Sequence, residues 1–145
     1  MIEQDTIRLL RECDAGIKMG ISSLDDSVKY VQNPKLKGIL DKSEKEHTKI
    51  KGDMQELLSI YHDDGKEPPA MAKSMEWFKT NVKMAVNASD NAVAEFITDG
   101  CNMGIKSLSR YLNQYQAADE KSKNISKKLI SIEEKPVSYT HLTLP

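Results

Sequence analysis

A helix-sized segment of this chain occurs twice, and this repeat restricts the folds that the chain can adopt. Residues 11–24 read RECDAGIKMGISSL and residues 99–112 read DGCNMGIKSLSRYL. When the two segments are aligned, the identical pairs are Cys13/Cys101, Gly16/Gly104, Ile17/Ile105, Lys18/Lys106 and Leu24/Leu112. Apolar residues in both copies recur at spacings of three and four, which is typical of one face of a helix. The repeat therefore predicts two helical hairpins related by pseudo-two-fold symmetry.

The composition of the 145 residues excludes several classes of protein. With 39% apolar and 30% charged residues, the chain is typical of one soluble domain with a single core. A net charge of −1 gives no broad electrostatic attraction to nucleic acid or to an anionic membrane. No apolar run approaches the roughly 18–20 residues of a transmembrane helix. Two cysteines without a signal peptide predict reduced thiols in a cytoplasmic protein.

Start and stop signals divide the chain into four long helices. Asp5 is the predicted N-cap of the first helix, and Asn33 followed by Pro34 is the predicted start of the second. The run HDDGKEPP at 62–69 is a break, after which we expect a short amphipathic helix inside a long connection. The predicted long helices span about 6–31, 34–61, 91–116 and 119–135, and the short one spans about 71–85.

The last ten residues, PVSYTHLTLP, contain no charged side chain, unlike the rest of the chain. The run from Val137 to Leu142 resembles the translation of a transposase-end sequencing adapter. We therefore expect the native domain to cover 1–135 and residues 136–145 to be a non-native tail. The fourth helix would then be truncated, by roughly three turns relative to the second. A native tail with β propensity is the alternative interpretation.

The lengths of the connections indicate how the helices are arranged. Short links join the first helix to the second and the third to the fourth, whereas a long connection joins the second to the third. This pattern predicts an all-α, ferritin-like four-helix bundle with a long crossover between its second and third helices. A simple up-down bundle with an enlarged middle loop is the alternative, and the repeat favours the ferritin-like arrangement.

Three segments also resemble a known family. RECDAGIKMGISSL and NPKLKGILDKSEKEH together resemble the first hairpin of an uncharacterised bacterial ferritin-like bundle family, a domain of unknown function. ITDGCNMGIKSLSRYLNQY resembles the third helix of that family. The resemblance covers roughly residues 5–135, and it implies the fold without implying an activity.

One short pattern is typical of a metal site. Di-iron proteins of the ferritin-like class place a Glu on each of two helices and Glu-x-x-His on each of the other two. Glu44 and His47 form this pattern in the second helix, and Glu133 lies near the equivalent position of the fourth. The predicted ligands of iron or manganese are therefore Glu44, His47 and Glu133, with the second His missing at position 136. The alternative is a core histidine that bonds to Ser43 or to a polar group of the third or fourth helix.

Two pairs of glycines lie inside the predicted helices, at Gly16 and Gly20 and at Gly100 and Gly104. Each costs roughly 1 kcal/mol relative to alanine, so some contact should offset the cost. We expect close packing of the first helix against the third at these positions. The alternatives are room for a ligand or for a partner helix in a dimer.

The cysteines of the repeat, Cys13 and Cys101, are expected to be small core residues beside the helix crossing. They could form a redox pair only if the two helices cross at the cysteines themselves.

These patterns predict a non-catalytic bundle without a cofactor, acting as an interaction or stress-associated protein. Its predicted partner is a second copy of the chain or a helical protein, with no role for nucleic acid or membrane. The alternative function is that of a ferritin-like metal-binding protein that handles iron, oxygen or peroxide. A thiol sensor that uses the two cysteines is a third hypothesis.

Overall fold

The computed structural model describes residues 2–66 and 90–143, together with their side chains except those of Asn91 and residues 137–143. The helices of this part are α1 (Ile2–Val28), α2 (Pro34–Ile60), α4 (Asp90–Gln114) and α5 (Glu120–Thr143). The described residues contain these four long helices and no strand, which confirms the predicted all-α four-helix bundle. The short helix predicted at 71–85 lies outside the described residues.

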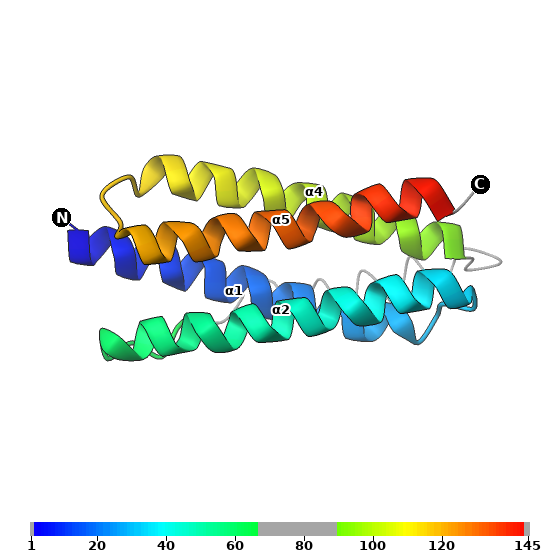
Figure 1. Cartoon of the computed structure of the whole chain (residues 1–145), viewed down its shortest axis with the longest axis horizontal. Coiled ribbons are helices and arrows are strands. Elements are labelled where there is room, and N and C mark those ends of the chain that lie inside the picture. Colours follow the sequence, from blue (N-terminus) through cyan, green and yellow to red (C-terminus); the bar gives the residue numbers. More distant parts are fainter. Residues whose placement is uncertain (1, 67–89, 144–145) are drawn as a thin grey trace.

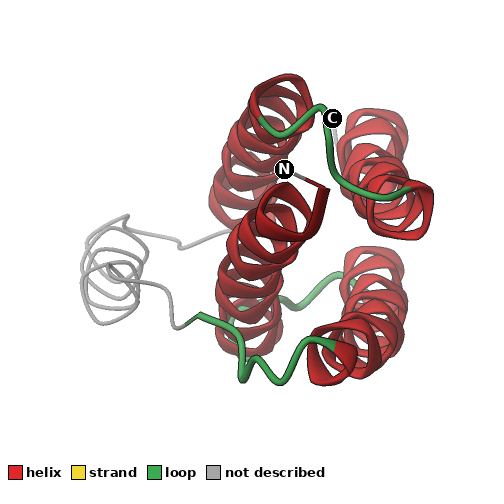
Figure 2. Cartoon of the chain, turned by 90° about the vertical axis from the view of Figure 1, so that its left-hand side faces the viewer, coloured by secondary structure: helices red, strands yellow, loops and turns green. Residues whose placement is uncertain are grey.

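The helices form two antiparallel hairpins that pack side by side (Figures 1 and 2). Helix α1 packs against α2 in one hairpin, and α4 packs against α5 in the other. The hairpins meet along two seams, where α2 packs against α5 and α1 packs against α4. The end-on view shows the four helices around one central axis (Figure 2).

Side chains at the two ends of the bundle define the direction of α4. At one end, the Asp90 carboxylate accepts hydrogen bonds from the backbone N–H groups of Gln32 and Asn33, at 2.7 and 3.0 Å, in the turn between α1 and α2. At the other end, Arg11 of α1 donates to Asp63, just after α2, at 3.0 Å. Helix α4 therefore begins at the end of the bundle opposite to the end of α2, so α2 and α4 run in the same direction (Figure 1).

The start of α2 follows its predicted cap. The Asn33 side chain accepts hydrogen bonds from the backbone N–H groups of Lys35 and Leu36, at 2.8 and 3.2 Å. Pro34 occupies the first helical position, where its missing N–H has no intrahelical partner to lose. Both features confirm the predicted boundary.

The predicted start of α1 is wrong, because the helix begins at Ile2 rather than after Asp5. The Asp5 carboxylate instead accepts a hydrogen bond from the backbone N–H of Ala117, at 3.2 Å, in the turn between α4 and α5. The neighbouring Thr6 hydroxyl accepts from the backbone N–H of Asp119, at 2.8 Å. The two side chains therefore join the hairpins at this end instead of capping their own helix.

The predicted end of the fourth helix is also wrong. Helix α5 continues past Lys135, with Pro136 inside it, and ends at Thr143. Proline removes one backbone donor but has a fixed φ near −65°, which suits a helix, so a helix can pass through it at a cost of roughly 3 kcal/mol. The 24 residues of α5 nearly match the 27 of α2, so the expected deficit of three turns is not observed. The non-native origin of residues 136–145 stays a prediction.

The core consists of two hydrophobic clusters that follow one another along the bundle. The first contains Leu9, Leu10, Cys13, Ile17, Ile50, Met54, Leu58, Leu108, Ala118, Ile125, Leu129 and Ile132. The second contains Leu24, Val31, Leu36, Leu40, Val93, Ala94, Ile97 and Cys101. The sequence positions between the clusters include Gly20 in α1, His47 in α2 and Gly104 in α4, and the candidate site lies there.

Candidate functional site

A buried hydrogen bond between His47 and Glu133 is the centre of the candidate site. Nε2 of His47 lies 2.7 Å from Oε1 of Glu133, which joins α2 to α5 across one seam between the hairpins. Nδ1 of His47 lies 2.7 Å from the carbonyl oxygen of Ser43, one turn earlier in α2. His47 is only 1% exposed and Glu133 only 8%. These contacts confirm the interpretation of His47 as a core histidine that bonds to Ser43 and to the fourth helix.

The surroundings of His47 change its affinity for a proton. Burial alone lowers the pKa of the imidazole, because it disfavours the charged form. The hydrogen bond and negative charge of Glu133, the Ser43 carbonyl and the charge of Glu46 all raise the pKa, and together they outweigh burial. The pKa of His47 therefore lies above its ordinary value of 6.5.

Two glycines make room for the pair. A Cβ added at Gly20 of α1 would lie 3.4 Å from Cδ2 of His47, and one added at Gly104 of α4 would lie 3.3 Å from Oε2 of Glu133. We refer to Gly20, His47, Gly104 and Glu133, one residue from each helix, as the polar layer. The layer separates the two hydrophobic clusters of the core.

The predicted close packing of α1 against α4 at all four glycines is wrong. The atoms nearest to Gly20 and Gly104 belong to side chains of α2 and α5 rather than to the partner backbone. Gly16 and Gly100 are exposed, and no described atom lies within 4 Å of a Cβ added at either position. The two glycines of each pair therefore have different environments, because positions four apart differ by about 40° around a helix and are offset along its axis.

Only two of the three predicted metal ligands meet. Glu44 is half-buried and lines a shallow surface hollow with Asp41, Lys45 and Thr48. Burial and the charges of neighbouring aspartates raise its pKa. Residues three apart in a helix point about 60° apart, so His47 reaches the bundle axis while Glu44 does not. The described residues contain no group of three or more His, Cys, Asp or Glu side chains placed to hold a metal ion.

The structure places the two cysteines in different clusters of the core. Sγ of Cys13 lies 3.2 Å from Oγ of Ser126 in the first cluster, and burial is the main cause that raises its pKa to about 12. Cys101 belongs to the second cluster, where burial and the adjacent Glu133 raise its pKa. Both thiols are free and buried, so the structure does not bring together the predicted redox pair.

A buried carboxylate at Asp14 in α1 is not among the site residues predicted from the sequence. Its side chain is fully buried, and Oδ2 lies 2.8 Å from Nζ of Lys18 and accepts from the backbone N–H of Lys66 at 3.1 Å. Gly65 approaches the same carboxylate with φ +94°, which favours glycine. A signal was present in the sequence, since Asp14 lies beside the apolar stripe of α1 and a glycine follows two aspartates in the break after α2.

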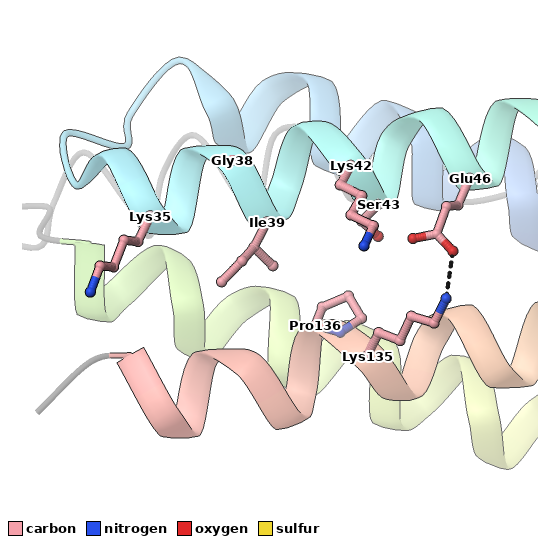
Figure 3. A pocket seen from close by; sticks show the side chains of 8 residues that line it. All are labelled: Lys35, Gly38, Ile39, Lys42, Ser43, Glu46, Lys135 and Pro136. Carbon is pink, nitrogen blue, oxygen red and sulfur yellow. Dashed lines mark hydrogen bonds and ion pairs between the residues drawn. The ribbon is translucent and has the colours of Figure 1, made fainter.

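A surface groove lies outside the polar layer, between α2 and α5 (Figure 3). Its volume is about 380 Å³, and it is lined by Lys35, Gly38, Ile39, Lys42, Ser43, Glu46, Lys135 and Pro136. An ion pair of 2.8 Å between Lys135 and Glu46 crosses it. Ser43 connects the groove to the site, because its carbonyl bonds to His47.

Comparison of the chain with protein-family models, with curated proteins and with solved structures gives no match. None of the helices formed by residues 2–66 and 90–143 is long and apolar enough to cross a membrane.

Proposed function

We propose that this chain is a non-catalytic, ferritin-like helical bundle that acts by association through a helical surface. The ferritin-like assignment is supported by the directions of the helices. The first two helices are antiparallel, and α4 begins at the end of the bundle opposite to the end of α2. A full-length crossover between the second and third helices is what distinguishes this arrangement from a simple up-down bundle.

The hydrogen bonds within the polar layer support a structural rather than a catalytic role for His47. Both ring nitrogens of His47 already have partners within the chain, at Ser43 and Glu133. A catalytic base needs a nitrogen within reach of a substrate proton. His47, being 1% exposed, instead contributes its hydrogen bonds to the joint between the hairpins.

The observation that carries the association proposal is the exposure of Gly16 and Gly100. Each should cost about 1 kcal/mol relative to alanine inside a helix, and neither has a described neighbour that would clash with a Cβ. The packing that explains Gly20 and Gly104 therefore does not apply to them. A second chain that approaches α1 or α4 closely would offset the cost, since small residues allow helices to come near one another.

The first test is the oligomeric state of the full chain. We expect the mass measured by light scattering to rise from monomer to dimer with concentration, because self-association depends on mass action. A Gly100→Glu variant should weaken the dimer, whereas Gly52→Glu, at an exposed glycine of α2 with equally open space, should not. A monomer at every concentration, or equal effects of the two variants, would contradict the proposal.

The same samples test the alternative function. Iron or manganese present in stoichiometric amount in the purified chain, measured by elemental mass spectrometry, would support a metal-handling bundle instead.

A further inference from the structure

The exposed side of α4 carries its charged residues in a regular order. Helix α4 packs against α5 and α1, and its remaining side faces solvent. Two acidic residues, Glu95 and Asp99, are exposed in the first half of the helix. Two basic residues, Lys106 and Arg110, are exposed in the second half. In the alignment of the repeat, the equivalent positions of α1 hold Ile7, Arg11, Lys18 and Ser22. The charge order therefore belongs to α4 and is not a consequence of the repeat.

This charge order does not stabilise α4 by itself. Residues four apart are neighbours on a helix surface, so Glu95 repels Asp99, and Lys106 repels Arg110. Within the described part of the chain, none of these four side chains forms an ion pair, and Arg110 instead lies over the ring of Tyr111. The helix dipole favours such charges only in the first and last turns, and all four lie further inside the helix. An oppositely charged surface of a partner would compensate for the repulsion.

A second, antiparallel copy of α4 has the required charges at the required positions. In two antiparallel copies of one helix, residues at equal distances before and after a common central point lie opposite each other. Glu95 and Arg110 are equally far from the point directly before Met103. Asp99 and Lys106 are also equally far from that same point. One arrangement of two copies therefore places each acidic residue opposite a basic residue of the other copy.

The central point of this arrangement coincides with an exposed apolar side chain. Met103 is 69% exposed, whereas the other large apolar side chains that are exposed among the described residues, Ile2 and Ile60, are terminal residues of their helices. At a rise of 1.5 Å per residue, Met103 lies within about 1 Å of the central point along the helix, so the two copies of it would meet. Asp99 and Gly100 lie on opposite sides of Met103, about 40° and 60° away around the helix axis.

We propose that the partner of this chain is a second copy, which binds antiparallel through α4 about a two-fold axis beside Met103. This inference rests on the association proposed above, and it names the partner and the surface. A two-fold dimer needs one self-complementary surface, and the charge order of α4 provides it. The charged residues form one edge of the contact, and Gly100 lies on the other edge, where a missing side chain lets the two helices approach. Because exposed ion pairs are screened by salt, the dimer should weaken as the salt concentration rises.

The first test reverses one charge of the contact in the full chain. Lys106→Glu places acidic residues opposite each other at two symmetry-related positions, and Asp99→Lys does the same with basic residues. We expect each variant to raise the Kd of the dimer, measured by analytical ultracentrifugation, by about tenfold or more. Within α4, each change replaces a repulsive pair four residues apart by an attractive one, so the urea midpoint of the monomer should stay equal or rise. A weaker dimer would then not be a result of unfolding.

The second test restores the contact by combining the two reversals. An equimolar mixture of the Lys106→Glu and Asp99→Lys chains should form a heterodimer with a Kd within a few-fold of the wild-type value, because every reversed charge then faces its opposite. The double variant Asp99→Lys/Lys106→Glu should likewise recover the homodimer. Lys128→Glu makes the same change of charge at an exposed lysine of α5 and should leave the Kd unchanged.

The outcomes distinguish this inference from the association on which it rests. A dimer whose Kd does not respond to Lys106→Glu, responds equally to Lys128→Glu, or is not recovered in the mixture would overturn the α4 contact and leave the proposed association intact. A monomer at every concentration would contradict both.

Discussion

Replacing Gly104 by alanine should destabilise the bundle, whereas the same change at Gly100, one turn earlier in α4, should stabilise it. Both changes gain about 1 kcal/mol of helix propensity. Within a single chain nothing opposes this gain at Gly100, because the position is exposed and no described atom lies within 4 Å of the new Cβ, so the two variants are compared at a concentration at which the chain is monomeric. At Gly104 the new Cβ would lie 3.3 Å from Oε2 and 3.4 Å from Cδ of Glu133.

The cost at Gly104 depends on whether Glu133 can move. Its carboxylate is buried and bonded to His47 at 2.7 Å, so a shift of a few tenths of an ångström lengthens that bond. Overpacking of this kind costs typically about 1–3 kcal/mol. After the gain in propensity is subtracted, Gly104→Ala should lose about 1 kcal/mol, and Gly100→Ala should gain about 1 kcal/mol.

Urea unfolding followed by circular dichroism measures this difference of about 2 kcal/mol, with equal slopes required for both variants. In a Glu133→Ala background the penalty at Gly104 should disappear, because the contacted atoms are gone. Changes of the same sign and size at Gly100 and Gly104 would refute our account of the polar layer.

Two further predictions concern other parts of the described structure. Gly65→Ala should destabilise the fold by roughly 1–3 kcal/mol in the same assay, because φ is +94° and the new Cβ would overlap the carboxylate of Asp14; Gly52→Ala, in open space within α2, should instead add up to about 1 kcal/mol. Cys13 and Cys101 should react with a disulfide reagent only as the chain unfolds, since both are buried and their pKa values are raised. The reaction is followed by absorbance, and a fast reaction of either thiol under native conditions would contradict the burial of that thiol.

Local signals were sufficient to predict much of the fold. The Asn33-Pro34 start of α2 depends on a cap and a fixed φ, both of which act within a few residues, and it is confirmed. The predicted start of α1 was wrong because Asp5 has the residue type of an N-cap, but its carboxylate accepts a hydrogen bond from Ala117, which is far away in the sequence. The predicted end of α5 was wrong because it excluded residues 136–145 as a non-native tail, whereas the helix continues through Pro136 to Thr143.

The candidate site shows the same division between local and distant effects. The repeat related Glu133 to Glu44, but the side chain that Glu133 contacts in the structure is His47. Glu44 and His47 are three residues apart, so their side chains point about 60° apart around the helix axis. At this angle His47 reaches the core while Glu44 does not. The space that Gly20 provides could not be predicted, because it depends on which side chains of other helices fill it.

The polar layer has a consequence for the alignment of the two hairpins. Helices α1 and α4 carry similar sequences, one in each hairpin. Apolar contacts are not directional, so alone they would tolerate a displacement of one hairpin along the other by a single helical turn of about 5.4 Å. Such a slip would separate His47 from Glu133 and break a buried pair, which costs about 3–5 kcal/mol. The His47–Glu133 pair therefore favours one register of the two hairpins over other registers that would also bury the hydrophobic clusters.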